Sequence, residues 1–181
     1  MRRILLVDDE QNILHALQRS LRQIAKSMDI RIELFTEPQA AIQRLGEVEF
    51  DFAISDYHMP RLDGVDFLRV AKEIQPDMVR MMLSASADFG TIMGAVNEAE
   101  VFKYIVKPWA GPELEQIVLA AIARHDQLIE ERKLINEQRA QCDVLTPEER
   151  EAKRLENIEP GITKVNWGPD GSILLDESDE G

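Results

Sequence analysis

Short apolar runs alternate with amphipathic stretches over the first two thirds of the chain. Uninterrupted or alternating apolar runs predict strands, and apolar residues spaced three and four apart predict helices. The strands are expected at Ile4–Val7, Ile30–Phe35, Phe50–Ser55, Val79–Ser84 and Phe102–Val106. The helices are expected at Ile13–Ile24, Pro38–Leu45, Val65–Ile74, Phe89–Ala99 and from Glu113 onward. This alternation predicts an α/β domain with a doubly wound parallel sheet covered by helices on both faces.

The pattern changes after the last predicted strand. Residues 123–145 are charged and rich in glutamine and contain no glycine or proline, so the helix begun at Glu113 is expected to run to about Cys142. An apolar or small residue recurs every seventh position, at Leu114, Ala121, Leu128, Ile135 and Cys142. The companion heptad positions are mostly polar, which weakens the coiled-coil signal. Both a solvated helix with one apolar stripe and a helix that pairs with another remain open.

The last part of the chain predicts a short helix and a β-hairpin. Thr146-Pro147-Glu148-Glu149 has the composition of a helix start, and this helix is expected to end near Leu155. The turn sequence at 168–171 separates two short apolar segments, which predicts a hairpin. The expected division is therefore a domain at 1–124, a helical extension at 125–145 and an acidic tail at 146–181.

Charge and composition narrow the function classes. The 181 residues include 34 acidic and 21 basic ones, for a formal net charge of -13. Such a surface disfavours binding to nucleic acid, whose phosphates it would repel. The single cysteine excludes an internal disulfide framework and a cysteine-based zinc cage. No apolar run approaches the roughly 18 residues of a membrane span, and no signal peptide is recognisable, so a cytoplasmic protein without membrane contact is expected.

Polar side chains follow the predicted strands at the edge where an open parallel sheet binds its ligands. The first strand is followed by Asp8, Asp9 and Glu10, and the third by Asp56, while the fourth ends in Ser84 and the fifth is followed by Lys107. Clustered carboxylates need a cation between them, and Mg²⁺ prefers oxygen ligands. A carboxylate can also accept a phosphoryl group, whose oxygens a lysine and a hydroxyl then stabilise.

Carboxylates, a lysine and a hydroxyl at one edge of the sheet predict Mg²⁺-dependent phosphoryl transfer. In this interpretation Asp56 is the nucleophile, Asp8 and Asp9 hold the metal with Glu10 as a further candidate, and Lys107 and Ser84 contact phosphoryl oxygens. Any one of these carboxylates could instead cap a helix or stabilise a turn.

The same residues carry a family resemblance. Residues 1–124 resemble the CheY-like receiver domain of two-component response regulators. The motifs that carry it are Ile4-Leu5-Leu6-Val7-Asp8-Asp9-Glu10, Asp56-Tyr57-His58-Met59-Pro60 with Asp63-Gly64, Leu83-Ser84-Ala85, and Tyr104-Ile105-Val106-Lys107-Pro108-Trp109. The resemblance implies a flavodoxin-like (βα)5 fold and Mg²⁺-dependent transfer of phosphate to Asp56 from the phosphohistidine of a sensor histidine kinase or phosphotransfer protein. It implies a signalling protein that catalyses its own phosphorylation and dephosphorylation, rather than an enzyme.

The resemblance also implies a role for each site residue. Asp9 and Asp56 would ligate Mg²⁺ directly, Asp8 directly or through water, and the backbone carbonyl of His58 would be a further ligand. Ser84 and Tyr104 match the switch pair of the family, which repacks the face of the fourth helix, fifth strand and fifth helix.

Two aromatic or imidazole side chains outside this set have expected positions of their own. Trp109 is either a partner anchor on the switch face or a packing residue at a helix start. His125 is expected on a helix surface.

The output of the chain stays open between several classes. The first hypothesis is a receiver with a non-DNA-binding tail that acts through contact with a downstream protein target or, as a homodimer, with a second copy. The second is a phosphotransfer intermediate in a relay. A DNA-binding regulator is disfavoured by the acidic tail, which lacks a basic recognition helix. A small aspartate-nucleophile phosphatase is disfavoured because His58 stands where such enzymes have a second acid.

Overall fold

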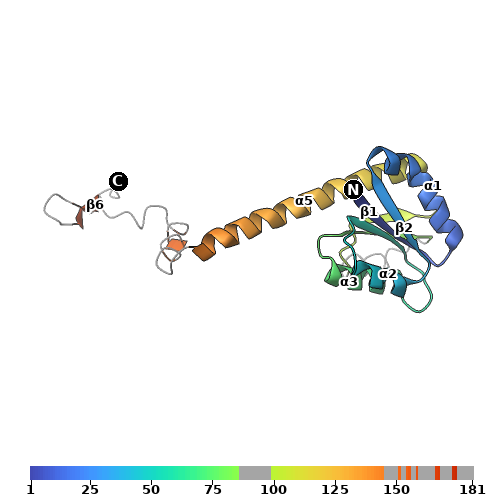
Figure 1. Ribbon diagram of the computed structural model, residues 1–181, viewed down its shortest axis with the longest axis horizontal. Coiled ribbons are helices and arrows are strands. Elements are labelled where there is room, and N and C mark those ends of the chain that lie inside the picture. Colours follow the sequence, from blue (N-terminus) through green and yellow to red (C-terminus); the bar gives the residue numbers. More distant parts are fainter. Residues whose placement is uncertain are drawn as a thin grey trace, which may run out of the picture. The chain divides into compact units, whose positions relative to one another are not determined.

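The computed structural model describes residues 1–85 and 99–144, together with 151, 154–155, 158, 166–167 and 173–174. Of residues 140–144 it describes the backbone only. The chain divides into two compact units, Met1–Glu131 and Arg132–Gly181. Figure 1 labels helices and strands of the chain.

The first unit is built on one five-stranded sheet. Its strands are β1 (Arg2–Val7), β2 (Ile30–Phe35), β3 (Phe52–Asp56), β4 (Val79–Ser84) and β5 (Lys103–Val106). All neighbouring strands are parallel, and their order is β2-β1-β3-β4-β5. This order is that of a flavodoxin-like doubly wound sheet, which confirms the predicted fold class. The third strand begins two residues later than predicted and includes Asp56 as its last residue.

The described helices are α1 (Gln11–Ser27), α2 (Pro38–Leu45), α3 (Gly64–Ile74) and α5 (Gly111–Val144). Local signals explain their starts. Pro38 occupies the first turn of α2, and the Asp63 side chain accepts a 2.8 Å hydrogen bond from the Asp66 N–H at the start of α3. The predicted helix Phe89–Ala99 lies outside the described residues, except for the helical Ala99.

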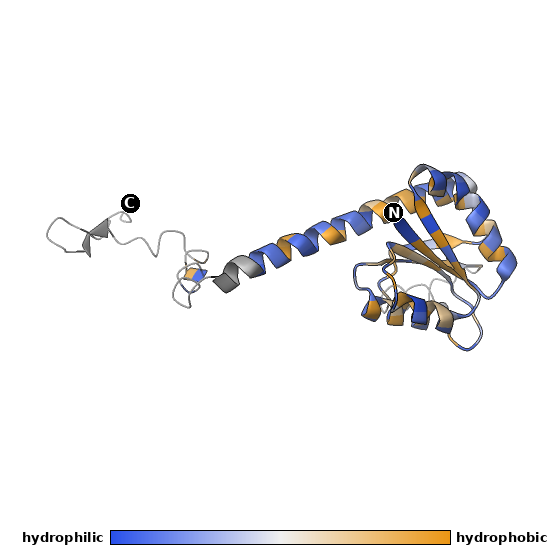
Figure 2. Cartoon of the chain, in the orientation of Figure 1, coloured by the Kyte–Doolittle hydropathy of each residue, from blue (hydrophilic) through white to orange (hydrophobic). Residues whose placement is uncertain are grey.

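Two hydrophobic cores lie on opposite faces of the sheet, because successive strand residues point to opposite sides. On the face covered by α1 and α5, the strands contribute residues such as Ile4, Leu6 and Ile54. On the face covered by α2 and α3, they contribute Leu5 and Ala53, among others. Figures 1 and 2 show the helices on both sides and the mixture of hydrophobic and hydrophilic positions along each of them. Burial on both faces explains why β1 is an almost unbroken apolar run.

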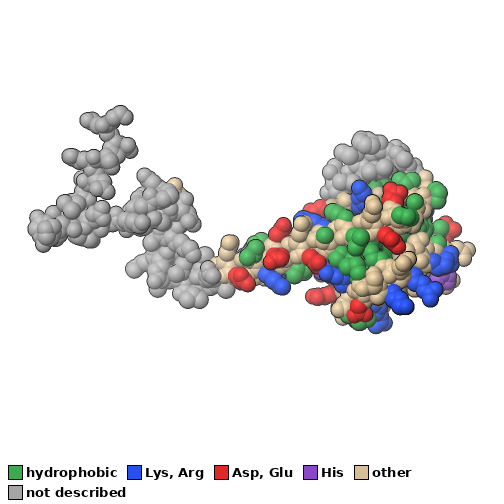
Figure 3. Space-filling view, turned by 90° about the horizontal axis from the view of Figure 1, so that it is seen from above, with side chains coloured by type: hydrophobic (Ala, Val, Ile, Leu, Met, Phe, Trp, Pro, Cys, Tyr) green, Lys and Arg blue, Asp and Glu red, His purple; other side chains and the backbone are tan. Residues whose placement is uncertain are grey.

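Helix α5 changes character along its length. Leu114 and Ala121 are fully buried in the core, and Leu128 packs against it from the edge. Farther along the helix Leu134 is 54% exposed and Ile135 is 50% exposed. In Figure 3, acidic, basic and hydrophobic side chains alternate there. The seven-residue recurrence is therefore not one continuous pairing seam, because its first members belong to the core of the domain. The helix extends two residues beyond the predicted end, to Val144.

The described part of the second unit contains short elements. Strands β6 (Asn166–Trp167) and β7 (Ile173–Leu174) pair antiparallel, as the predicted hairpin requires. Residues 151, 154–155 and 158 are helical, and the rest of the predicted short helix lies outside the described residues. The boundaries at 124 and 145 stay predictions. Among the described residues, no helix combines the length and apolar character needed to cross a membrane.

Glu33 ties β2 to its neighbours through arginines. Its carboxylate accepts hydrogen bonds from Arg3 Nη1 of β1 at 2.9 Å and from Arg44 Nε of α2 at 2.8 Å, and Arg31 Nε lies 3.3 Å away. The Glu33 side chain is only 12% exposed. The hydrogen bond from Arg44 lowers the pKa of Glu33, against the opposing effect of burial, and the nearby arginine charges lower it further.

We expect Glu33→Gln to lower the free energy of unfolding at neutral pH by about 1–2 kcal/mol, the usual size for hydrogen bonds to a charged group. Because the folded-state pKa of Glu33 is depressed, its stabilisation is present above the unfolded value and is lost as the pH falls through the folded value. Urea unfolding of both proteins at neutral pH and in steps below pH 4.5 measures this. A difference that stays constant over the series would contradict the prediction.

Candidate functional site

The carboxyl ends of the strands bring the predicted site residues to one edge of the sheet. Asp8 follows β1, Asp56 ends β3, and Lys107 follows β5. Parallel pairing aligns these ends, as the pairs Val7↔Ser55, Asp56↔Leu83 and Ser84↔Val106 show. Segments that are far apart in the sequence therefore meet here, as predicted from the strand ends.

Lys107 joins the two buried carboxylates of this edge. Its Nζ donates to Asp8 Oδ2 at 2.9 Å and pairs with Asp56 Oδ1 at 2.7 Å. Asp8 is 0% exposed and Asp56 is 6% exposed. One ammonium thus serves two carboxylates that are largely removed from water.

The charges of these groups perturb one another. Burial raises the pKa of Asp8, against the opposing hydrogen bonds from Lys107 and from the backbone N–H of Glu10. Burial alone would lower the pKa of Lys107, but its hydrogen bonds to Asp56 and Asp8 outweigh that effect and the pKa is raised. Two buried carboxylates against one ammonium leave an excess of negative charge, which favours a further cation.

Backbone groups hold the second oxygen of each carboxylate. Asp8 Oδ1 accepts from the Glu10 N–H at 2.9 Å, and Asp56 Oδ2 accepts from the His58 N–H at 3.1 Å. Each carboxylate is therefore oriented from two sides, by Lys107 and by the loop that follows its own strand.

Three carboxylates at this edge could hold a metal ion. Asp8, Asp9 and Asp56 each offer one oxygen, and these oxygens all lie within 4.8 Å of one another. A donor set made only of oxygens fits Mg²⁺. The cluster does not include Glu10, whose backbone N–H supports Asp8 instead. The role of the His58 carbonyl stays a prediction.

Comparison with known proteins agrees with this geometry. The family model described as the response regulator receiver domain matches residues 4–119. The chain belongs to this family.

The chain matches part of longer curated proteins. The hydrogenase transcriptional regulatory protein HoxA of Bradyrhizobium diazoefficiens is 37% identical over 120 residues, which is 66% of this chain and 24% of HoxA. The chain spans about a quarter of the length of the first curated relatives it matches.

Solved structures, including the following two, share the fold. The signal receiver domain of an HD domain-containing protein from Pseudomonas fluorescens Pf-5 is 30% identical, with a TM-score of 0.64 over 70% of this chain and 98% of that one. A structure titled adenylate cyclase from Rhodopirellula baltica is 29% identical, with a TM-score of 0.67 over 75% of this chain and 97% of that one.

Gly64 packs directly against the backbone of Asp56 in this receiver domain. Its N–H donates to the Tyr57 carbonyl at 2.9 Å. A Cβ atom at this position would overlap the carbonyl oxygen of Asp56 and lie 2.9 Å from its carbonyl carbon and 3.0 Å from Tyr57 Cα. The motif Asp63-Gly64 was visible in the sequence, but the close approach that requires a glycine was not.

The expected switch residues of the receiver domain lie together. Ser84 is buried at the end of β4, and its carbonyl accepts from the Lys107 N–H at 2.8 Å. Burial raises the pKa of the half-buried Tyr104 on β5, against a hydrogen bond with the Ser84 side chain that lowers it. The structure thus brings both residues together beside Asp56; their role in switching is part of the proposal below.

The structure favours one of the two interpretations of Trp109 and corrects the prediction for His125. Trp109 Nε1 donates to Ser20 Oγ of α1 at 3.1 Å, and the ring packs against the core, which favours the packing interpretation. His125 is not an ordinary surface residue: its Nδ1 lies 3.6 Å from Asp51 Oδ1 and 3.7 Å from Asp126 Oδ1. Asp51 directly precedes β3, so His125 is at the other end of the sheet from the acidic cluster.

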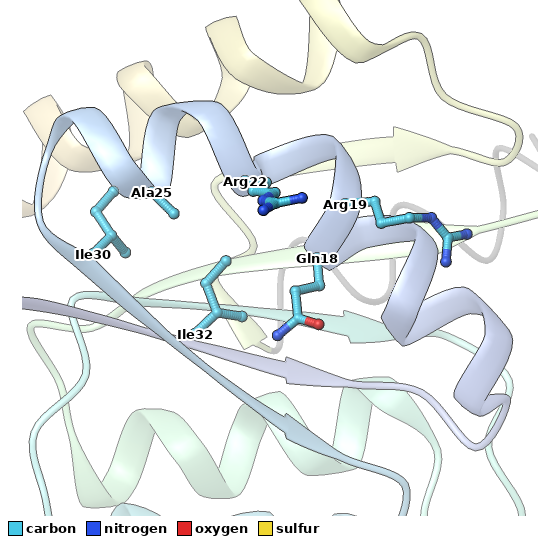
Figure 4. A pocket seen from close by; sticks show the side chains of 6 residues that line it. All are labelled: Gln18, Arg19, Arg22, Ala25, Ile30 and Ile32. Carbon is cyan, nitrogen blue, oxygen red and sulfur yellow. The ribbon is translucent and has the colours of Figure 1, made fainter.

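A separate groove lies between α1 and the early part of β2 (Figure 4). Its lining residues are Gln18, Arg19, Arg22, Ala25, Ile30 and Ile32. None of them is a carboxylate, and Ile30 is the first residue of β2, whereas the acidic cluster follows the last residues of the strands. This groove is therefore not part of the candidate phosphoryl site of the receiver domain.

Proposed function

We propose that Asp56 accepts a phosphoryl group from the phosphohistidine of a sensor histidine kinase or phosphotransfer protein in a Mg²⁺-dependent reaction. The observation that carries this proposal is the Lys107 ammonium, 2.7 Å from Asp56 and 2.9 Å from Asp8, inside a cluster of three carboxylates. Membership of the receiver family supports the same reaction.

The reaction balances with the residues present. A carboxylate oxygen of Asp56 attacks the phosphorus, the bond between phosphorus and the histidine nitrogen breaks, and the imidazole leaves with its electron pair and takes up a proton. Asp8, Asp9 and Asp56 would hold Mg²⁺, which when bound neutralises charge on the carboxylates and on the phosphoryl oxygens. Lys107 stabilises a phosphoryl oxygen, and hydrolysis of the acyl phosphate returns Asp56 to its free form.

The output we propose is a protein–protein contact at β5 and α5. Tyr104 and Val106 lie two residues apart in β5, so they share one side of the strand; Val106 is exposed, and so is Phe102, which directly precedes the strand. Tyr104 also contacts Ser84 beside Asp56. A movement of Ser84 and Tyr104 toward a phosphoryl group would therefore change the apolar surface next to them, which a downstream partner could read.

A second copy of the chain is one partner that could cover the half-exposed Leu134 and Ile135 on α5. A phosphorelay intermediate shares the first chemical step and differs only in passing the phosphoryl group on. The named relatives include a transcriptional regulator and an adenylate cyclase, and neither activity is carried over to this chain.

The direct test is binding of Mg²⁺ and beryllofluoride, which mimics a phosphoryl group. Trp109 lies two residues after Lys107, so its fluorescence should change on binding, and Trp167→Phe removes the signal of the other tryptophan. Light scattering on the same samples measures mass. A fluorescence change that requires both Mg²⁺ and beryllofluoride supports the site, and a doubled mass supports the homodimer. An unchanged fluorescence with no bound beryllofluoride would contradict the proposal.

We expect Lys107→Ala to slow phosphorylation by a small phosphodonor by about ten- to a hundredfold, since it removes one charge that stabilises the transferring group. It should also remove the fluorescence response, because no ammonium remains to link the phosphoryl group to the loop after β5. Lys103→Ala is the matched control, because Lys103 is an exposed lysine on β5, the strand that Lys107 follows. Equal rates for the two variants would show that Lys107 has no part in the reaction.

A further inference from the structure

Arg80 is a buried arginine inside β4 that the proposed chemistry does not use. It is 5% exposed. Its Nε donates to the carbonyl of Ala99 at 2.9 Å, and its Nη1 donates to the carbonyls of Met78 at 2.7 Å and Pro76 at 3.3 Å. The guanidinium therefore connects the segment that precedes β4 with the segment that precedes β5.

The backbone of Arg80 also binds the segment that precedes β5, at a second residue. Its carbonyl accepts a 2.8 Å hydrogen bond from the N–H of Phe102. Arg80 thus binds residues 99–102 at both ends. Its side chain binds Ala99, and its main chain binds Phe102.

The turn itself is held in an uncommon conformation. Glu100 has a φ of 49°, in the left-handed region that non-glycine residues rarely adopt. Its carboxylate pairs with Lys72 of α3 and lies 3.5 Å from Arg80 Nη2. A backbone conformation this unfavourable must be stabilised by surrounding contacts, and the ion pairs of Glu100 with Lys72 and Arg80 supply part of that stabilisation.

The strand that follows is short and lies at one edge of the sheet. β5 has four residues, and within the described part of the chain it pairs with β4 alone, in the register Met81↔Lys103, Met82↔Tyr104, Leu83↔Ile105 and Ser84↔Val106. A slip by one residue would turn Tyr104 to the other face of the sheet and displace Lys107. Fixing the turn at 99–102 therefore also fixes the two site residues that follow it.

We infer that Arg80 is a positioning residue that sets β5 against β4 and thereby places Tyr104 beside Ser84 and Lys107 beside Asp56. This inference rests on the proposed function, because it assigns Arg80 a part in the response to a phosphoryl group at Asp56. A buried apolar side chain would fill this strand position without burying a charge, but it could not hold the Ala99 carbonyl.

The test is ¹⁹F NMR of protein labelled with 3-fluorotyrosine, in the presence of Mg²⁺ and beryllofluoride. The chain has two tyrosines, so Tyr57→Phe assigns the signal of Tyr104. The same spectrum shows bound beryllofluoride. Wild type should show bound beryllofluoride and a shifted Tyr104 signal. Arg80→Met should bind beryllofluoride about ten- to a hundredfold more weakly, as for a misplaced catalytic group, and Tyr104 should not shift at saturation.

The outcomes separate this inference from the proposed function. Absence of bound beryllofluoride in wild type would contradict the proposed function itself. If wild type responds and Arg80→Met shows the same Tyr104 shift with only a lower thermal stability, Arg80 has a structural role and the inference is wrong. Arg69→Met, an exposed arginine on α3, is the control for loss of one positive charge.

Two more variants keep the test decisive if Arg80→Met does not fold. Arg80→Lys keeps the charge, but one ammonium cannot hold the separate carbonyls, so the Tyr104 shift should again be lost. Glu100→Gly relieves the left-handed conformation and leaves the Arg80 contacts to Ala99 and Phe102 in place, so the shift should remain. A normal shift in Arg80→Lys, or a lost shift in Glu100→Gly, would overturn the inference.

Discussion

Asp56→Asn is expected to abolish phosphorylation of the protein, whether the donor is a histidine kinase or a small molecule such as acetyl phosphate. The amide oxygen of asparagine is a far weaker nucleophile than a carboxylate, and the variant also removes one carboxylate of the proposed metal cluster. We expect a reduction of more than about a thousandfold, since both the attacking group and a metal ligand are lost. Intact-mass analysis after incubation with Mg²⁺ and acetyl phosphate measures the product.

This loss is not expected to reflect unfolding. Asp56→Asn removes one of the two buried carboxylates that share Lys107, and Asp8 keeps its 2.9 Å contact with that ammonium. Relief of repulsion between like charges should leave the free energy of unfolding equal to or higher than that of wild type. Asp66→Asn, on α3, is the control for replacing a carboxylate elsewhere. An acyl phosphate that still forms on Asp56→Asn, for example at Asp8 or Asp9, would contradict the assignment of the acceptor.

Gly64→Ala is expected to destabilise the fold by about 2–4 kcal/mol, at the upper end for overpacked positions. The added Cβ would overlap the carbonyl oxygen of Asp56, and backbone atoms cannot move aside as a flexible side chain can. The cause is steric rather than torsional, because the φ of Gly64 lies outside the left-handed region.

A second glycine provides the matched control for this variant. A Cβ at Gly111, the first residue of α5, would meet no atom within 4 Å, so Gly111→Ala should be neutral or slightly stabilising. Urea unfolding compares the two variants, and beryllofluoride binding reports on the loop that carries Asp56. We expect Gly64→Ala to weaken that binding as well, since the clash pushes on the acceptor backbone. Equal stability of the two variants would show that the loop relaxes without cost.

Much of the candidate site could be predicted because its chemistry lies at the ends of strands. Each of Asp8, Asp56, Ser84 and Lys107 closes or follows an apolar run that only a buried strand explains. In a parallel sheet such ends meet at one edge, so order along the chain already implied proximity in space. Glu10 was the exception: it has the right residue type, but its backbone rather than its carboxylate supports the cluster.

The sequence by itself determined the fold class and the residues of the acidic edge, because apolar periodicity and strand ends are local signals. Only the tertiary structure decided the surroundings of Gly64, Arg80 and His125. Gly64 packs against the backbone of Asp56, and Arg80 donates to the carbonyl of Ala99. His125 lies close to the carboxylate of Asp51. It also showed that Leu114 and Ala121 belong to the core while Ile135 faces solvent. A repeat along a helix cannot show where the packed domain ends, since burial depends on what lies beside each residue and not on its spacing.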